Sequence, residues 1–114
     1  MSDINTLYHN DFGISFVWKT RTIRNKGIVE IVFRDTGLSL SYNDIETMYA
    51  KVKSEIITTS LCKDCINNKK CKLLLLELPS SSVSFAMSYF EMTQMLDLLK
   101  GTLFQLDLNE LIDL

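Results

Sequence analysis

The feature that most constrains the fold of this chain is a change in the spacing of its apolar residues. Segments 14–18 and 38–41 alternate apolar and polar or β-branched residues, as half-buried strands do, and segment 28–33 between them is predicted as a further strand. Beyond residue 41 the apolar residues recur at i, i+3, i+4, i+7 and i+11, which is the spacing of one helix face. The helix face comprises Ile45, Met48, Tyr49, Val52 and Ile56. The pattern therefore predicts three strands and then an amphipathic helix, with Asn43 as N-cap and Glu46 completing a capping box.

The second half of the chain follows the same plan about 45 residues later. Segment 73–78 matches 28–33, and segment 83–86 matches 38–41 without a gap. Ser88 and Glu91 have the spacing of a capping box and open a second helix that runs towards Gly101. We interpret this as a βββα unit that occurs twice, over residues 13–57 and 58–102. Chance similarity between two amphipathic segments is the alternative interpretation.

Two such units predict an α+β fold, with an antiparallel sheet that carries both helices on one face. The length of 114 residues, with one proline and four glycines, predicts a single domain over residues 1–114. Residues 103–114 fit either an alternating strand or a short helix that begins at Asn109. We expect this apolar, acidic segment to complete the core or to pack on a second copy of the protein.

Composition argues against several classes of protein. With 46% hydrophobic and 23% charged residues the chain resembles a soluble globular protein, and its net charge of −2 gives it no overall attraction to polyanions. The longest apolar run, residues 73–76, is far too short to span a membrane. The N-terminal residues lack the pattern of a signal peptide, so we expect a cytoplasmic protein that does not bind membranes.

All three cysteines fall within ten residues, at Cys62, Cys65 and Cys71. A Cys-x-x-Cys turn can direct two thiolates at one tetrahedral metal, and a third cysteine of the same loop can join them. One interpretation is therefore a structural zinc site, for which His9 or Asp64 would supply the fourth ligand. The alternatives are three free thiols in a connecting loop, or a redox-active Cys-x-x-Cys pair, although no apolar helical pattern follows the pair.

Basic residues gather in two segments that occupy equivalent places in the two units. If both loops lie on one edge of the protein, they form a patch for nucleic acid or another polyanion, and Trp18 adds a surface on which a base could stack. The competing interpretation is that they are solvated loop tips whose lysines protect sheet edges from pairing. The residues concerned are Lys19, Arg21, Arg24 and Lys26 in the first unit and Lys63, Lys69, Lys70 and Lys72 in the second.

Residues 7–13 (Leu-Tyr-His-Asn-Asp-Phe-Gly), the following hairpin, the alternating segment 38–41 and the capped helix together resemble a family of small uncharacterised proteins from Bacteroidetes. Some members of that family carry a Cys-x-x-Cys in the first hairpin. Residues 17–20 of this chain hold no cysteine, and Cys62 and Cys65 stand at the matching place in the second unit. The family has no assigned activity, so the resemblance bears on the fold more than on the function.

The sequence offers little that would serve an enzyme. It has no glycine-rich phosphate loop, and its single histidine lies in a turn-like stretch. We therefore expect a small non-catalytic interaction domain that binds a protein partner or a second copy of itself. A nucleic-acid or polyanion binder is the first alternative, and a thiol redox protein is the second.

Overall fold

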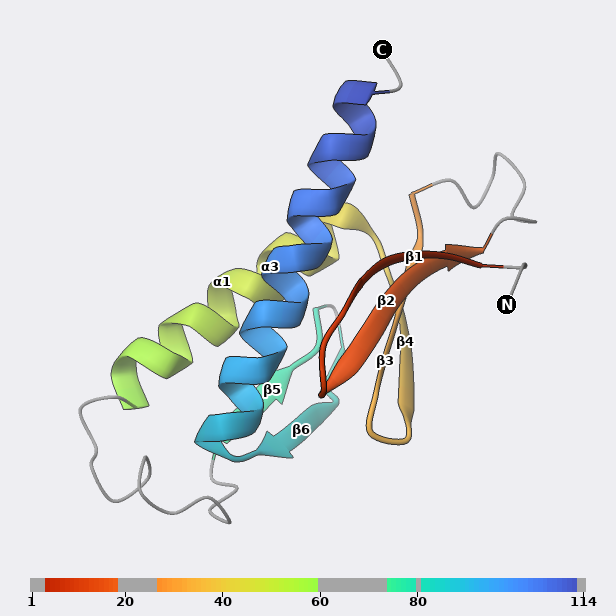
Figure 1. Cartoon of the computed structure of the whole chain (residues 1–114). Helices are drawn as coiled ribbons and strands as arrows, with labels where there is room; N and C mark the ends of the chain where they lie inside the picture. The colour runs from red at the N-terminus through yellow and green to blue at the C-terminus, as the bar shows by residue number, and fades with distance from the viewer. Residues whose placement is uncertain (1–3, 19–26, 60–73, 80, 113–114) are drawn as a thin grey trace.

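A computed structural model of the protein describes residues 4–18, 27–59, 74–79 and 81–112. These residues form an α+β domain in which two helices pack against an antiparallel sheet, as the sequence predicted (Figure 1). The elements in chain order are β1 (Ile4–His9), β2 (Gly13–Trp18), β3 (Val29–Phe33), β4 (Thr36–Leu40), α1 (Tyr42–Thr59), β5 (Leu74–Glu77), β6 (Ser84–Met87) and α3 (Tyr89–Ile112).

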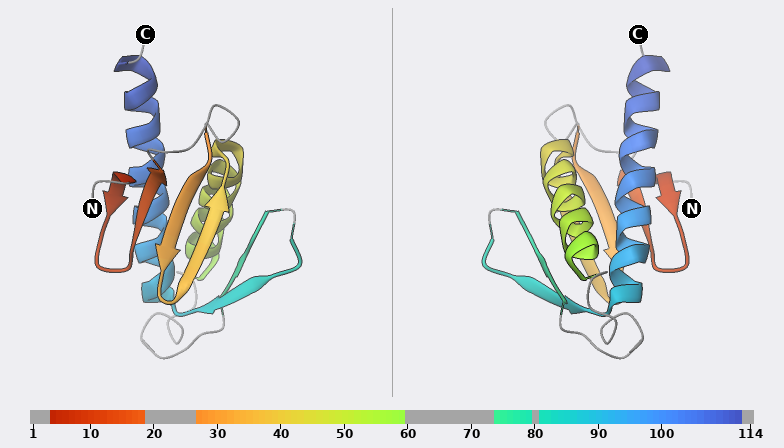
Figure 2. Two further views of the ribbon diagram at one scale, coloured as in Figure 1. Left: turned by 90° about the vertical axis from the view of Figure 1, so that its right-hand side faces the viewer. Right: turned by 90° about the vertical axis from the view of Figure 1, so that its left-hand side faces the viewer.

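The strands form two separate groups in the described part of the chain. Strands β1 to β4 make a four-stranded antiparallel sheet in sequential order, and β5 and β6 make a two-stranded hairpin. Both helices lie on the same side of the four-stranded sheet (Figure 2). The prediction of a single antiparallel sheet is therefore wrong for the described residues, because β5 and β6 pair only with each other there.

The core lies between the helices and the sheet. Strand β3 directs Val29, Ile31 and Phe33 inward, and all three are almost completely buried. Because side chains alternate along a strand, Glu30 and Val32 point to the opposite face. The face of α1 predicted from spacing is confirmed at its centre, and α3 has a corresponding buried face. The side chains there that are fully buried are Ile45, Met48 and Val52 of α1 and Met92, Met95 and Leu99 of α3.

The two helix N-termini differ in how well they were predicted. At α3 the predicted capping box is confirmed, because the Glu91 amide donates to Ser88 Oγ (3.1 Å) and the Ser88 amide donates to Glu91 Oε1 (3.0 Å). At α1 the assignment of Asn43 and Glu46 is wrong by two residues. Ser41 is the N-cap there, and it exchanges equivalent bonds of 3.2 Å with Asp44.

Strand β1 was not predicted as a strand, since its sequence does not alternate cleanly. Its pairing with β2 explains this: the register shifts between Thr6 and Tyr8, so that Leu7 is an extra residue in a β-bulge. The bulge changes which residues face the core partway along the strand. Strand β4 begins earlier than the predicted segment 38–41, since Thr36 and Gly37 belong to it, and Arg34, with a left-handed φ of 51°, and Asp35 form the turn that precedes it.

Helix α3 does not end near Gly101. It continues without a break to Ile112, which excludes the strand interpretation of residues 103–114 as far as they are described. Gly101 permits a close approach instead of ending the helix. A Cβ atom added at this position would lie 2.5 Å from the nearest atoms of the Tyr8 ring.

The predicted match between the two halves is wrong in its second strand. Val29 pairs with Leu40 in the first hairpin and Leu74 pairs with Met87 in the second, so the second hairpin is two residues longer. Leu38, which faces Ile31, therefore corresponds to Phe85, which faces Leu76, and not to residue 83. The first strand of the second predicted unit would fall in residues 60–73, outside the described residues.

Candidate functional site

The predicted metal-binding residues are largely outside the described residues. Cys62, Cys65, Cys71 and Asp64 all fall between residues 60 and 73. His9 is described, and it lies exposed at the end of β1. Among the described residues no group of three or more histidine, cysteine, aspartate or glutamate side chains could hold a metal ion.

The eight basic residues of the predicted polyanion patch also lie in undescribed segments, 19–26 and 60–73. The residues that flank those segments are described. The first segment leaves β2 at Trp18 and returns at Gly27, whereas the second joins the end of α1 to the start of β5 (Figure 1). The prediction that these two segments share one edge stays a prediction.

The side of the four-stranded sheet that faces away from the helices carries a run of apolar residues. Partners in the strand register share a face, so Trp18 lies beside Ile4 and Ile14 lies beside Val32 on this side, with Phe16 between them on β2. No helix of the described part of the chain covers this side (Figure 2). We call Ile4, Ile14, Phe16, Trp18 and Val32 the outer sheet face.

The outer sheet face has aromatic side chains at one end and polar residues around it. The Phe16 and Trp18 rings meet edge to face, with centroids 5.3 Å apart, and 39% of Trp18 is exposed. Glu30 of β3 is the register partner of Phe16, and its carboxylate oxygens lie 2.8 and 2.9 Å from Ser39 Oγ, which donates the hydrogen bond. This arrangement of an apolar centre and a polar border is typical of a protein-binding surface.

The 7–13 motif holds β1 and β2 against α3. Asn10 Oδ1 accepts hydrogen bonds from the amides of Phe12 (2.9 Å) and Gly13 (3.0 Å), which shapes the turn between the strands. Asn10 Nδ2 donates to the Gln94 carbonyl of α3 at 3.0 Å. Gly13 is needed because a Cβ there would lie 2.4 Å from the Val32 carbonyl oxygen.

Tyr8 of the same motif also contacts α3. Its hydroxyl donates to Asp97 Oδ2 at 2.8 Å, and Asn10 Nδ2 donates to the same oxygen at 3.0 Å. The hydrogen bond to Asp97, with smaller contributions from burial and from the charge of Asp97, raises the pKa of Tyr8 above its usual value of 10.0. The phenol is therefore neutral at physiological pH and stays hydrogen-bonded to Asp97, so Tyr8 has a structural role.

Ser15 and Thr102 form a fully buried polar contact between β2 and α3. Their hydroxyl oxygens lie 2.6 Å apart, and Thr102 Oγ1 also donates to the Leu98 carbonyl at 2.6 Å. The Ser15 hydroxyl lies 3.3 Å from the Tyr8 carbonyl as well. Both hydroxyls are satisfied within the fold, so neither has the free reactive oxygen of a nucleophile.

Arg34 is a contact that the sequence gave no reason to single out. Its guanidinium donates to the Ala86 carbonyl at 3.0 Å and forms an ion pair of 2.9 Å with Glu91, the partner in the α3 capping box. One side chain from the β3–β4 turn thus connects the sheet to β6 and to the start of α3. The pairing engages the carboxylate of Glu91 in structural contacts.

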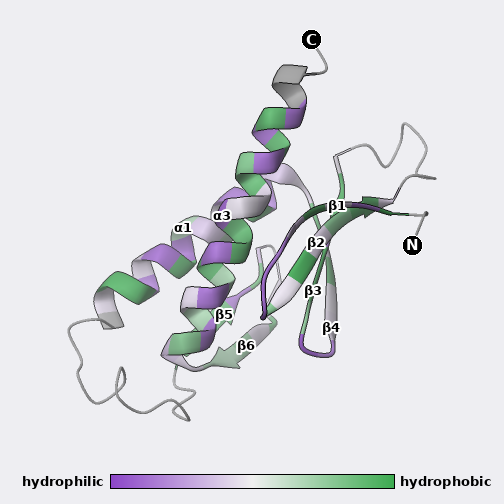
Figure 3. Ribbon diagram, viewed as in Figure 1, coloured by the Kyte–Doolittle hydropathy of each residue, from purple (hydrophilic) through white to green (hydrophobic). Residues whose placement is uncertain are grey.

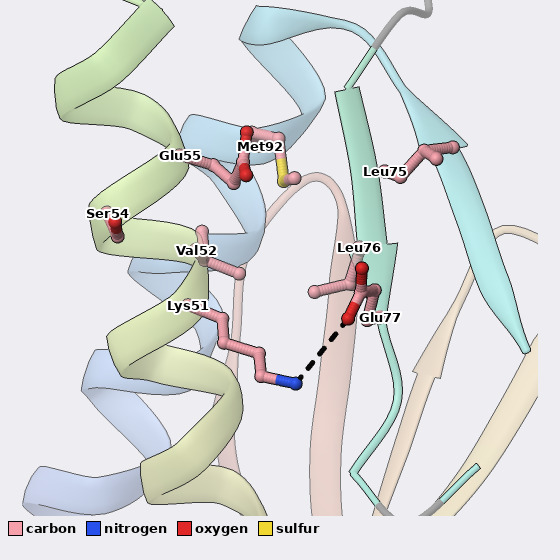
Figure 4. A pocket seen from close by; sticks show the side chains of 8 residues that line it. All are labelled: Lys51, Val52, Ser54, Glu55, Leu75, Leu76, Glu77 and Met92. Carbon is pink, nitrogen blue, oxygen red and sulfur yellow. Dashed lines mark ion pairs between the residues drawn. The ribbon is translucent and has the colours of Figure 1, made fainter. Parts of the chain in front are cut away.

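A small cleft lies between α1 and β5 (Figure 4). Its volume is about 210 Å³, and Val52, Leu76 and Met92 form its buried apolar wall. Lys51 and Glu77 form an ion pair of 3.7 Å across the two elements. The cleft is smaller than the 300–1,000 Å³ common for small-molecule sites.

Comparison with known proteins identifies no relative: no family model, curated protein or solved structure matches this chain. The resemblance to the Bacteroidetes family stays a prediction. Among the described residues no helix has the length and apolar character needed to cross a membrane. The outer sheet face is a candidate site that follows from the strand register of this chain.

Proposed function

We propose that this protein is a small non-catalytic interaction domain that binds a protein partner through the outer sheet face. The observation that carries the proposal is the row of apolar side chains from Ile4 and Trp18 to Ile14 and Val32, on a sheet face that neither α1 nor α3 covers. Burial of such a surface against an apolar partner stabilises a complex by about 25 cal/mol per Å² of apolar area before the costs of association.

Charge favours a protein partner over a nucleic acid at this face. The register places Glu30 on it, and neither lysine nor arginine stands at any of its described positions. A phosphate backbone would meet the carboxylate of Glu30 at this face, and the like charge disfavours its approach. A protein surface with an apolar centre meets no such penalty.

The absence of catalytic chemistry is part of the same proposal. The carboxylate of Glu91 and the hydroxyls of Ser15, Ser88 and Thr102 serve caps and packing contacts. The cleft between α1 and β5 holds no histidine or cysteine among its lining residues. These contacts support binding over catalysis. We also propose that the binding takes place in the cytoplasm.

A comparison of matched variants tests the proposal. Trp18→Glu puts a charge on the outer sheet face, whereas Phe90→Glu does the same at an aromatic residue of α3 that is 58% exposed. We expect partners captured from a nuclease-treated lysate by the wild-type chain and by Phe90→Glu to be lost with Trp18→Glu. Equal capture by all three chains would contradict the assignment of this face.

Binding of a nucleic acid or polyanion is the alternative function. Trp18 is the single tryptophan, so its fluorescence reports on this end of the protein. Quenching by a random-sequence oligonucleotide that disappears as salt rises would favour the basic residues Lys19–Lys26 and Lys63–Lys72 as a phosphate site. Fluorescence that is unchanged at low salt would leave protein binding as the better proposal.

The cysteines require a separate measurement. Native mass spectrometry of reduced protein, together with elemental analysis, would find one zinc per chain if Cys62, Cys65 and Cys71 bind it. Loss of folded structure with a chelator would make the site structural. A stable metal-free protein would leave loop thiols, and a reversible disulfide with a measurable potential would favour the redox alternative.

We also propose that the two halves arose by duplication of one unit. The hairpins β3–β4 and β5–β6 each lead into a capped helix, and the register makes Ile45, Met48 and Val52 equivalent to Met92, Met95 and Leu99. All six side chains are fully buried. A homologue with higher identity between its halves, aligned with the two-residue difference, would support this proposal.

A further inference from the structure

Helix α3 is much longer than the sheet that it covers. Its 24 residues span about 36 Å, whereas strands of five or six residues span about 17–20 Å. The C-terminal part of α3 therefore extends beyond the sheet (Figure 1). Hydrophobic positions continue along this extension (Figure 3).

The exposed side of the extension is apolar at its centre. Phe104 and Leu108 are four residues apart, so they lie on one face of the helix, and they are 66% and 38% exposed. Leu103 and Leu106 are partly buried and pack against the core. Helix α3 thus has a second apolar stripe, formed by Phe104 and Leu108, that stays exposed in the described part of the protein.

Charged residues flank this stripe in a self-complementary order. Lys100 and Asp107 are both exposed and are seven residues apart, so they lie along the same side of Phe104 and Leu108. Asp107 is held in place by Tyr42, whose hydroxyl donates to Asp107 Oδ1 at 2.7 Å. In sequence the basic residue Lys100 precedes Phe104, and the acidic residue Asp107 stands between Phe104 and Leu108.

We propose that α3 binds α3 of a second copy of this chain, with the two helices antiparallel. If a twofold axis passes beside Phe104, each Lys100 comes level with Leu108 of the other copy and adjacent to its Asp107. Two equivalent Lys100–Asp107 pairs then flank the Phe104 and Leu108 contacts. A parallel arrangement would instead place Lys100 level with Lys100 and Asp107 level with Asp107, which forms no Lys100–Asp107 pair, so the charges favour the antiparallel one.

The contact is small, which sets the expected strength. Few side chains per copy contribute, so the buried area falls below the 1,200–2,000 Å² of a stable complex. We therefore expect a reversible dimer that dissociates at micromolar concentrations. This surface is distinct from the outer sheet face, so the inference goes beyond the proposed function and does not depend on it.

Sedimentation equilibrium of the full chain over a wide concentration range tests the proposal. We expect the mass to rise from 13.1 kDa to twice that value, and Phe104→Glu to hold it at 13.1 kDa. Phe90→Glu, on the same helix, and Trp18→Glu, on the outer sheet face, should still dimerise. A monomer at every concentration, or an unchanged dimer in Phe104→Glu, would overturn the proposal.

Charge reversal tests the antiparallel arrangement itself. Lys100→Asp should weaken the dimer at least tenfold, because the new carboxylate of each copy then lies beside Asp107 of the other copy and repels it. The double variant Lys100→Asp/Asp107→Lys should recover dimerisation, whereas a parallel pair or an unrelated interface would show no recovery. Circular dichroism of each variant shows whether it is folded, which separates loss of the dimer from loss of folding. Leu108→Ser is a milder change in the same stripe and should also weaken the dimer.

Discussion

The contact between Gly101 and Tyr8 gives the sharpest test of the structure, because two opposing effects meet there. Gly101 lies in the interior of α3, where alanine is normally more stable than glycine by about 1 kcal/mol. The structure predicts the reverse. An alanine Cβ would lie 2.5–2.6 Å from three ring atoms of Tyr8, well inside the contact distance of about 3.5–4.0 Å for carbon atoms.

The size of the effect follows from how firmly the ring is held. Tyr8 belongs to β1, which pairs with β2, and its hydroxyl is bound to Asp97. The ring must therefore move by about 1 Å against both constraints. Overpacking of this kind costs about 1–3 kcal/mol, and the upper end applies to a rigid, doubly held ring. After the gain in helix propensity is subtracted, Gly101→Ala should destabilise the protein by about 2 kcal/mol.

Urea denaturation followed by circular dichroism measures this difference, and a second background tests its cause. In Tyr8→Ala the ring is gone, so the same Gly101→Ala change should stabilise the protein by about 1 kcal/mol relative to Tyr8→Ala alone. The sign of the substitution thus reverses between the two backgrounds. A stabilised Gly101→Ala in the wild-type background would refute the argument, because α3 and β1 would then not approach each other as closely as described.

Further predictions concern the caps, the buried hydroxyls and the response to pH. Ser88→Ala removes the α3 N-cap and should lower the free energy of unfolding by about 1 kcal/mol, which would appear as a lower urea midpoint. Thr102→Val should cost about 1–2 kcal/mol, and a double-mutant cycle with Ser15→Ala should show coupling between the two sites. The hydrogen bond to Asp97 raises the pKa of Tyr8 in the folded protein. The contribution of this bond to the free energy of unfolding is therefore complete below about pH 10, and it is lost as the pH rises through the pKa that Tyr8 has in the folded state. The stability difference between wild type and Tyr8→Phe should therefore narrow above pH 10 in thermal melts, and a constant difference would contradict the hydrogen bond.

Local patterns were enough to predict the elements that follow from local chemistry. The spacing of Ile45, Met48 and Val52 identified the buried face of α1, because an amphipathic helix must bury its apolar side. The pair Ser88 and Glu91 identified the start of α3, because both halves of a capping box lie within four residues. The α+β class followed from the order of these patterns.

The errors arose where a distant residue decides the local structure. Gly101 reads as a helix end in sequence, but Tyr8, far away in the chain, occupies the space that a side chain would need. The error at α1 is local instead: Asn43 is a good N-cap by residue type, but the neighbouring Ser41 and Asp44 make the reciprocal bonds. The outer sheet face was not predicted either, because its residues come from three strands whose register no local pattern contains.

The sequence by itself thus determined the start of α3, the buried face of α1 and the α+β class, since these depend on periodicity and on contacts within a few residues. Only the tertiary structure decided that β1 is a bulged strand, that α3 passes through Gly101 to Ile112, and that Phe104 and Leu108 remain exposed beyond the sheet. Those features depend on which segments meet in space. Their energies come from packing and hydrogen bonds between residues that are up to 89 positions apart, as for Tyr8 and Asp97.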